Sequence, residues 1–446
     1  MMAVEITEEF VWQNIPRRPR DSHKGTFGSV LAVAGSAFYR GAALLAAEGA
    51  LRTGAGIVTL ASVEPVVSAA AACLPECCLC PCRAGAEGGI SPENVPLLRR
   101  QKATVLLLGP GLGGTAQSAA RAAETQALVQ QLLPGFAGSA VLDADGLNAA
   151  ARLLAEGAAF PHPAGELIVT PHPGEMARLT GLSAAQINAD REGTALRYAQ
   201  AWNAVVVLKG ARTVVAAPDG RVRVNPTGNP GLSRGGSGDV LAGMTAALLA
   251  CRLPAYEAAA CAVYLHGAAA DRAAACYDAY YEAVYTAART AMDAQDYAAA
   301  VNALEGMQRE NVSEKYADID DIYNEANYNY ANELYAQKKP YEALRYYRNI
   351  PDYKDVTEKK LNRICYRILG SWVSAKGIKM EFRDDGTCTI DGKDGYFNVS
   401  MYAMSVGTRA NDLNQNWQIY SCTDKSLSVI NNSNKTQYKL TRVTEE

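Results

Sequence analysis

The chain has 446 residues, of which 49% are apolar, and a formal net charge of -3 at pH 7. This length predicts two or three domains, and the small net charge gives no electrostatic basis for binding nucleic acid or an anionic membrane. The first residues lack the apolar core of a secretory signal, and no run of about eighteen uncharged apolar residues occurs. We therefore expect a cytoplasmic protein with neither a membrane nor a nucleic-acid partner.

The eleven cysteines and four histidines do not form a metal-binding pattern. Five cysteines crowd into CLPECCLCPC (73–82), a spacing that fits neither a disulfide framework nor paired CxxC zinc ligands. We interpret them as reduced thiols in and around a buried strand. The histidines are too scattered for a histidine-rich site, so we predict no dedicated metal site.

Composition changes sharply near residue 276. Nineteen of the 23 tyrosines follow this residue, whereas 31 of the 38 glycines precede it. A change of this size without a Pro/Ser linker indicates a domain boundary. We predict domains at 1–276, 277–368 and 369–446.

The first segment alternates short apolar runs with alanine-rich helical stretches. Runs that are apolar throughout are typical of parallel strands covered by helices on both faces. A doubly wound α/β domain is therefore predicted, with ligands at the carboxyl ends of its strands. The expected strands are SVLAVAG (29–35), GIVTLAS (56–62), TVLLLGP (104–110), AVLDADG (140–146), ELIVTPHP (166–173) and AVVVLKG (204–210).

Two patterns distinguish the remainder. Residues 285–307 and 327–350 align at an offset of 44, which matches Tyr297 with Tyr341, and small and aromatic residues recur there at helical spacing. This predicts stacked helical hairpins of the tetratricopeptide type over 277–368. From about residue 370, period-two alternation around Asp-Gly turns predicts a small antiparallel β domain.

Two glycine-rich segments could approach a ligand. LLLGPGLGG contains GxGxxG at Gly109, Gly111 and Gly114, but no carboxylate follows about twenty residues later, as a dinucleotide-binding fingerprint requires. The first suitable acids are Asp143 and Asp145. We interpret these glycines as a place where the backbone closely approaches some ligand.

The second segment, NPTGNPGLSRGGSGDVLAGM (225–244), precedes a helical apolar run. The amides of residues 235–238 at a helix N-terminus would form an anion hole suited to phosphate. Asp239 beside that hole could accept a proton from an attacking hydroxyl. The alternative is that Asp239 is an ordinary N-cap residue, and the residues alone leave both interpretations open.

Six motifs occur here in one order and carry a resemblance to a known family. They are HKGTFGSVLAVAGSAFYRGAALLAAEGALRTGAGIVTLA, LGPGLG, VLDADGLNA, VTPHPGEMARL, VVLKGARTVV and NPTGNPG with GGSGDVLAG. Over residues 3–275 the chain resembles the ADP/ATP-dependent NAD(P)H-hydrate dehydratase family. The resemblance implies a ribokinase-like α/β/α sandwich that returns hydrated NADH or NADPH to the working cofactor. It also implies ADP or ATP as co-substrate, Mg²⁺ held mainly by phosphates and water, and a homotetramer.

The resemblance assigns roles to individual residues. Asp239 would be the base, while the amides of Gly236, Ser237 and Gly238 hold the charge on the transferred phosphoryl group. The substrate-binding residues would be Ala42, Gly113, Asn148, His172 and Asp239. The nucleotide-binding residues would be Lys209, Gly210, Ala211, Arg212, Thr213 and Gly238. From the residues alone, His172 could be a turn residue and Lys209 could extend from a buried strand toward solvent.

The chain departs from the family pattern at two places. NPGLSRGGSGD replaces the usual NPGMATGGSGD, so that Arg234 adds a cation beside the anion hole, where it would contact phosphate or crowd the nucleotide. After residue 275, CYDAYYEAVYTAA replaces the usual closing segment.

Two alternative functions stay open from the sequence. One is a ribokinase-fold kinase of a small hydroxylated substrate. The other is a binding protein whose helical repeats recognise a peptide or protein beside a vestigial enzyme domain.

Overall fold

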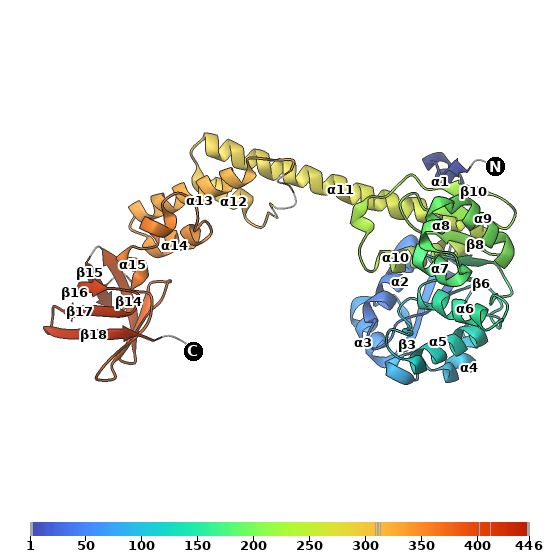
Figure 1. Ribbon diagram of the computed structural model, residues 1–446, viewed down its shortest axis with the longest axis horizontal. Helices are drawn as coiled ribbons and strands as arrows, with labels where there is room; N and C mark the ends of the chain where they lie inside the picture. Colours follow the sequence, from blue (N-terminus) through green and yellow to red (C-terminus); the bar gives the residue numbers. More distant parts are fainter. Residues whose placement is uncertain are drawn as a thin grey trace. The chain divides into compact units, whose positions relative to one another are not determined.

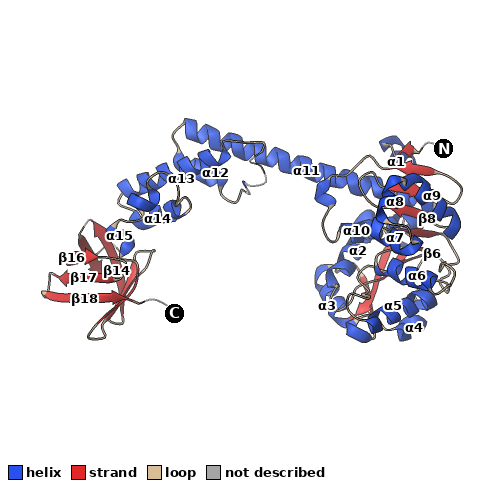
Figure 2. Cartoon of the chain, in the orientation of Figure 1, coloured by secondary structure: helices blue, strands red, loops and turns tan. Residues whose placement is uncertain are grey.

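A computed structural model describes residues 3–307, 309, 312, 314–400, 402–410 and 412–443. The chain divides into two compact units, Met1–Ala275 and Cys276–Glu446. Figure 1 follows the elements in chain order, and Figure 2 distinguishes the α/β content of the first unit from the helices and strands of the second. In the described ranges, no helix is long and apolar enough to cross a membrane.

The first unit is built on a ten-stranded sheet in the order β1-β10-β9-β8-β7-β6-β5-β2-β3-β4. The seven strands from β8 to β4 run parallel, while β9 is antiparallel to both its neighbours. All six strands predicted from the sequence are present, as β2, β3, β5, β6, β7 and β8. The bounds are β1 Val4–Glu5, β2 Ser29–Val33, β3 Ile57–Val63, β4 Cys78–Cys82, β5 Val105–Leu108, β6 Ser139–Leu142, β7 Leu167–Val169, β8 Val205–Leu208, β9 Val214–Ala216 and β10 Val222–Val224.

Helices cover both faces of this sheet. From β2 the chain crosses toward β4, and from β5 it crosses in the opposite direction toward β8. Right-handed crossovers in opposite directions place their helices on opposite faces, so α2 and α3 lie on one face and α5 to α9 on the other, with α10 packed against α2. The bounds are α1 Glu8–Asn14, α2 Arg40–Thr53, α3 Glu64–Cys73, α4 Val95–Arg99, α5 Ala119–Leu132, α6 Asp145–Ala155, α7 Pro173–Thr180, α8 Ala184–Ala189, α9 Arg191–Trp202 and α10 Ser237–Ala250.

The central strands consist of fully buried apolar residues. Every residue of β5 is buried, and Leu31, Val141 and Val206 of neighbouring strands have no exposed surface. Burial on both faces explains why these strands read as continuous apolar runs. Polar residues directly follow several of the parallel strands, with Asp143 after β6, Thr170 after β7 and Lys209 after β8, so these residues collect at one edge of the sheet.

The cysteine-rich segment forms the edge strand β4. All eleven cysteines are free thiols, and Cys77, Cys80 and Cys82 are buried. Burial raises the pKa of Cys77 to about 11 and that of Cys82 to about 12. These thiols pack as small apolar side chains and stay protonated at neutral pH.

The second unit joins helices to a β barrel. α11 (Ala255–Asp293) begins in the first unit, and α12 Tyr297–Leu304, α13 Ile319–Ala336, α14 Pro340–Arg348 and α15 Ile364–Arg367 follow it. Gln295 in the turn before α12 and Lys338 in the turn before α14 both have a left-handed backbone conformation. The assignment of these hairpins to the tetratricopeptide type stays a prediction.

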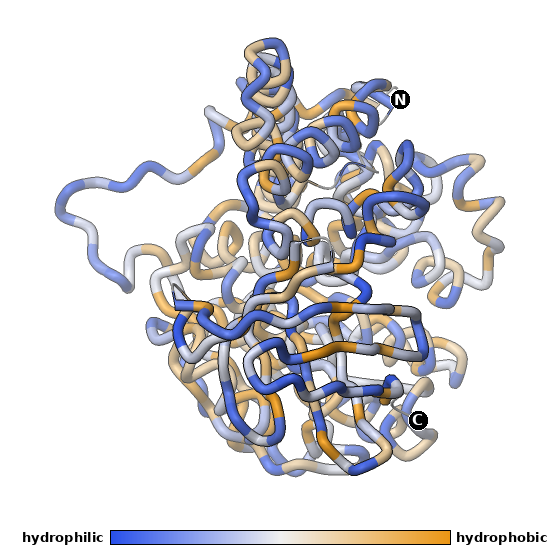
Figure 3. Tube along the Cα trace, turned by 90° about the vertical axis from the view of Figure 1, so that its left-hand side faces the viewer, coloured by the Kyte–Doolittle hydropathy of each residue, from blue (hydrophilic) through white to orange (hydrophobic). Residues whose placement is uncertain are grey.

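The antiparallel β domain is a closed eight-stranded barrel, which the alternation in the sequence did not specify. Both hydrophobic and hydrophilic residues occur in the barrel (Figure 3), buried residues alternate with more exposed ones along β17, and Trp372 is fully buried inside the unit. One hydrophobic cluster contains residues of α13, α14 and the barrel, so 277–368 and 369–446 share a core. The strands are β11 Gly370–Ser374, β12 Lys379–Phe382, β13 Thr387–Ile390, β14 Lys393–Ser400, β15 Ala403–Gly407, β16 Gln415–Cys422, β17 Ser426–Asn431 and β18 Thr436–Arg442.

Candidate functional site

The polar residues that follow the parallel strands gather around two cavities of the first unit. The loop after β5 contains Gly109 to Gly114, Asp143 directly follows β6, and Lys209 directly follows β8. Parallel strands present their carboxyl ends at a common edge, where ligands bind in sheets of this kind. The direction in which successive strands are added to the sheet reverses between β2 and β5, which places a topological switch point at this edge.

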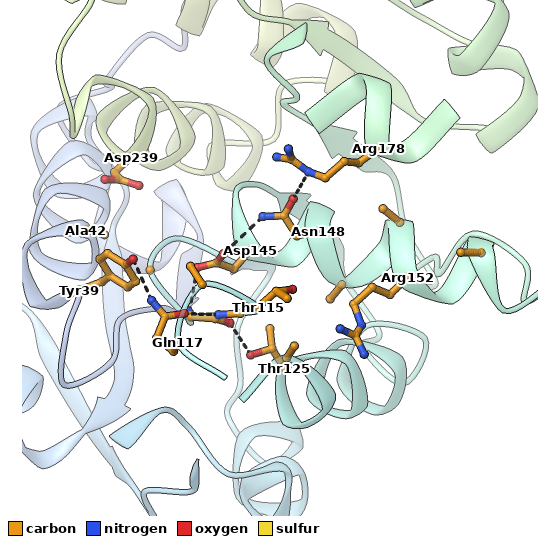
Figure 4. A pocket seen from close by; sticks show the side chains of 18 residues that line it. Tyr39, Ala42, Thr115, Gln117, Thr125, Asp145, Asn148, Arg152, Arg178 and Asp239 are labelled. Carbon is orange, nitrogen blue, oxygen red and sulfur yellow. Dashed lines mark hydrogen bonds between the residues drawn. The ribbon is translucent and has the colours of Figure 1, made fainter. Parts of the chain in front are cut away.

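The first cavity has a volume of about 700 Å³ (Figure 4). Four of the five residues predicted to bind substrate line it: Ala42, Gly113, Asn148 and Asp239. The sequence did not single out its other polar lining residues, which include Tyr39, Gln117, Arg152 and Arg178.

The second cavity has a volume of about 650 Å³. Its lining includes the whole predicted nucleotide segment, 209–213, together with Ser237 and Gly238. His172, predicted for the substrate pocket, lies in the lining of this second cavity instead. Arg234 and His266 also line it.

The N-terminus of α10 lies between the two cavities. Gly236 is the N-cap residue with φ of +95°, a left-handed conformation that favours glycine. The next two residues, Ser237 and Gly238, line the second cavity, and Asp239 lines the first. The free amides and positive end of a helix at this place suit an anion.

Asp239 is not the N-cap of α10. That position belongs to Gly236, and no side-chain cap hydrogen bond forms at this helix. Within the described residues, the Asp239 carboxylate has neither a hydrogen bond nor an ion pair. The structure therefore contradicts the interpretation of Asp239 as an N-cap residue.

A buried ion-pair cluster lies beside α10. Lys209 Nζ is 2.7 Å from Asp143 Oδ1 and 3.8 Å from Glu175 Oε2, and Thr170 Oγ1 donates to Asp143 Oδ1 at 2.7 Å. Asp143 and Glu175 are almost completely buried. Burial lowers the pKa of Lys209, but the two carboxylates outweigh this effect and raise it overall. Lys209 thus stays charged in the wall of the second cavity.

The same cluster affects Asp239. The pKa of Asp239 is raised to about 7, mainly by burial and then by the carboxylates of Asp143, Asp145 and Glu175, while Lys209 opposes the increase. A carboxylate with a pKa near the working pH is well matched to accepting a proton.

His172 is the N-cap of α7. Its Nδ1 accepts a hydrogen bond from the Gly174 amide at 3.0 Å, and Glu175 Oε2 accepts one from the His172 amide at 2.8 Å. Burial and the nearby Lys209 and Arg178 lower the pKa of His172. The imidazole therefore acts in this structure as a neutral capping group at the edge of the second cavity.

A chain of hydrogen bonds crosses the first cavity. The Gly113 amide donates to Asp145 Oδ2 at 2.8 Å, and Asn148 Nδ2 donates to Asp145 Oδ1 at 3.4 Å. Arg178 Nε in turn donates to Asn148 Oδ1 at 2.8 Å. Gly109 packs so tightly on the Asp143 backbone that a Cβ there would overlap the carbonyl oxygen. This contact fixes the β5 loop against the start of α6.

The loop over the second cavity is fastened to α11. Asp271 accepts hydrogen bonds from the Gly228 amide at 2.8 Å and from Asn229 Nδ2 at 3.0 Å. These partners are about 40 residues apart in the sequence and form no local motif, so the contact could not be predicted.

Comparison with known proteins identifies the first unit. A family model described as NAD(P)H-hydrate dehydratase matches residues 30–291. The chain belongs to this family. A bifunctional NAD(P)H-hydrate repair enzyme of Moorella thermoacetica is 45% identical over 271 residues, which is 60% of this chain and 49% of that protein. The chain spans about half the length of the first curated relatives it matches.

Solved structures of the family share the fold. One is the ADP/ATP-dependent NAD(P)H-hydrate dehydratase of Bacillus subtilis co-crystallised with ATP/Mg²⁺, with a TM-score of 0.52 and 36% identity over 60% of this chain and 88% of that one. Another is a ribokinase-like protein of Enterococcus faecalis, with a TM-score of 0.52 and 28% identity over 61% of this chain and 88% of that one. The predicted ribokinase-like α/β fold is confirmed.

Proposed function

We propose that this protein uses ADP or ATP to dehydrate the hydrated forms of NADH and NADPH, restoring the working cofactors. The observation that carries the proposal is the N-terminus of α10, where Ser237 and Gly238 line one cavity and Asp239 lines the other. This arrangement suits a reaction in which a phosphoryl group passes from a nucleotide in the second cavity to a hydroxyl in the first. Membership of the NAD(P)H-hydrate dehydratase family supports that choice of substrates.

The chemistry proceeds in two stages. Asp239 accepts the proton of the substrate hydroxyl, whose oxygen bonds to the terminal phosphorus of the nucleotide as the bond to the leaving AMP or ADP breaks. The amides of Gly236, Ser237 and Gly238 stabilise the charge on the transferred group. In the second stage, the carbon–oxygen bond breaks and phosphate departs with its electron pair. Loss of a proton from the adjacent ring carbon then forms the double bond of NADH or NADPH.

The second cavity supplies the groups that a nucleoside polyphosphate needs. Lys209 places a charged ammonium beside Gly238, where a Cβ added to the glycine would lie 3.5 Å from Nζ. Gly210, Ala211, Arg212 and Thr213 continue the same wall, and Arg234 adds a second cation to the lining. We assign Arg234 to phosphate contact, because its charge complements the anion.

Mg²⁺ fits this site as a companion of the nucleotide. No group of three His, Cys, Asp or Glu side chains in the described part of the chain is placed to hold a metal ion. Mg²⁺ commonly binds through phosphate oxygens and water with few protein ligands. When bound, it would neutralise phosphate charge. The Bacillus subtilis relative co-crystallised with ATP/Mg²⁺ supports this assignment.

The test is recovery of absorbance near 340 nm when the full chain is incubated with hydrated NADH and Mg²⁺ plus ADP or ATP. Parallel reactions with hydrated NADPH measure the cofactor preference. The proposal expects NADH and inorganic phosphate to form together in equal amounts. A stable phosphorylated product without NADH would instead identify a kinase, and no reaction with either donor would reject both enzymes.

Two partner assignments remain proposals. We propose a homotetramer formed through the first unit and a peptide or protein ligand for the helices of 277–368. Light scattering on the full chain and on a chain ending at residue 276 tests the first assignment, because a tetramer through the first unit survives the truncation. Pull-down with the isolated second unit tests the other only if that unit folds alone, which circular dichroism establishes first.

A further inference from the structure

The first cavity has Asp239 at one end and two arginines at the other, with Asp145 between them. Asp239 and Asp145 contribute carboxylates, and Arg152 of α6 and Arg178 of α7 contribute guanidinium groups. Figure 4 shows both arginines on the α6 and α7 side of the cavity, away from Asp239 and Ala42. A ligand with one neutral and one anionic part would therefore bind in one direction.

Helix α6 sets the distance between Asp145 and the basic end of the cavity. Asp145, Asn148 and Arg152 are spaced i, i+3 and i+7 and lie on one face of the helix. Seven residues of α-helix correspond to about 10 Å along the axis. This length leaves room for a ribose between a nicotinamide-derived ring near Asp145 and a phosphate near Arg152.

Both arginines are held in the same way. Arg152 Nε donates to Gln126 Oε1 at 2.8 Å, and Arg178 Nε donates to Asn148 Oδ1 at 2.8 Å. Both acceptors are neutral amide oxygens. In the ranges that the structure describes, neither guanidinium lies within 4.0 Å of a carboxylate. Each side chain is thus oriented through Nε while its charge and both Nη groups remain available.

We propose that Arg152 and Arg178 form the subsite that binds the diphosphate of the hydrated dinucleotide. This inference rests on the proposed function for the substrate, and it adds the residues that recognise its anionic part. A guanidinium matches phosphate oxygens with paired N–H groups. The diphosphate is common to hydrated NADH and hydrated NADPH, so this subsite does not distinguish them. Binding there orients the neutral hydrated ring toward Asp239.

The experiment compares Arg152→Gln, Arg178→Gln and a control, Arg100→Gln. Arg100 is exposed, is also anchored through Nε to an oxygen, that of Pro96, and lies outside the lining of both cavities. Each variant is assayed at saturating ADP with hydrated NADH and with hydrated dihydronicotinamide riboside, which lacks both phosphates. For hydrated NADH we expect KM to rise about 10-fold or more in each cavity variant, because hydrogen bonds to charged groups are lost, with kcat nearly unchanged. For the riboside we expect no change in KM.

Binding provides a readout that does not depend on turnover. Fluorescence titration with NADH should show the same loss of affinity in the two cavity variants, none in Arg100→Gln, and a weaker salt dependence than in the parent chain. Unchanged KM and unchanged NADH affinity would overturn the proposal. Equal losses with the riboside would also overturn it, as would a penalty confined to hydrated NADPH, which would place the 2′-phosphate there. If the parent chain binds NADH but forms no product, the proposed function fails while the subsite is still judged by titration.

Discussion

Lys209 Nζ and Asp143 Oδ1 are 2.7 Å apart, in a wall shared by residues from the ends of β6 and β8. This ion pair connects the two cavities electrostatically. Lys209 lines the second cavity, whereas Asp143 is the largest charged contributor to the raised pKa of Asp239, which lines the first cavity. The charge of one wall therefore influences the proton affinity of the proposed base.

Replacement of the base tests the mechanism directly. Asp239→Asn removes the proton acceptor while keeping the shape of the side chain, so we expect turnover to fall by about 100- to 10,000-fold. Affinity for ADP, measured by calorimetry, should change little. The control is Asp219→Asn, which removes an exposed carboxylate outside both cavities. Near-normal turnover in Asp239→Asn would contradict the proposed mechanism.

The pH dependence of the reaction follows from the same carboxylate. Because Asp239 acts when deprotonated and its pKa is about 7, kcat/KM should increase as pH rises through about 7 and level off above it. Asp143→Asn removes a neighbouring negative charge, which should move this limb to lower pH. The exposed Glu93→Gln change should leave it in place. A limb that stays near pH 7 in Asp143→Asn would exclude the electrostatic coupling.

Stability should respond to Asp239 in the opposite sense to activity. Folding raises the pKa of this carboxyl from 3.8 to about 7, so the folded state binds its proton more tightly than the unfolded state does. The ionised group therefore reduces stability progressively from about pH 4 to pH 7, and fully above that range. Asp239→Asn should raise Tm at pH 8 more than at pH 5, as measured by calorimetry without ligands. An equal change in Tm at both pH values would argue against a raised pKa.

Loss of the Lys209 cation should be costly to the fold. Lys209→Met leaves Asp143 and Glu175 buried without their shared partner, and breaking a buried pair from one side typically costs about 3–5 kcal/mol. Urea denaturation measures this loss against Lys339→Met, which removes an exposed lysine that pairs with Glu342. Adding Asp143→Asn to Lys209→Met should recover part of the stability, since one uncompensated charge is removed.

Asp271 is expected to control nucleotide affinity. Its carboxylate holds Gly228 and Asn229 in the loop that lines the second cavity. Asp271→Ala should raise KM for ADP by about 10-fold and leave KM for hydrated NADH unchanged. The exposed Asp278→Ala change on the same helix is the control. Equal effects on both substrates would indicate general damage to the first unit rather than a role in this loop.

The sequence predicted the architecture of the first unit well, because its strands are buried on both faces. Runs such as residues 105–108 are apolar throughout and end at a polar residue or glycine, which locates both the strand and the edge of the sheet where the candidate site lies. The closed barrel was harder to predict from the sequence. Alternation and Asp-Gly turns specify antiparallel pairing, whereas closure depends on β11 pairing with β18, whose partner residues are 66 to 70 positions apart in the sequence.

The site was predicted in part, for a similar reason. Asp239 and the 209–213 segment could be proposed from the sequence because each lies within a short contiguous motif. Arg152 and Arg178 resemble ordinary helix-surface arginines in the sequence, and only the packing of α6 against α7 turns both toward one cavity. His172 illustrates the converse, since the family resemblance implied the substrate pocket, whereas in the structure His172 lines the second cavity.

Gly238 and Asp239 are adjacent in the chain but line different cavities, which also constrains the order in which the ligands of the proposed reaction bind and leave. In the proposed reaction, a phosphoryl donor beside Gly238 and an acceptor beside Asp239 occupy two cavities that adjoin the same helix N-terminus. Transfer then requires a ternary complex, in which both ligands are bound to the protein at the same time. In the proposed reaction, the nucleotide therefore transfers its phosphoryl group to the dinucleotide only while both cavities are filled.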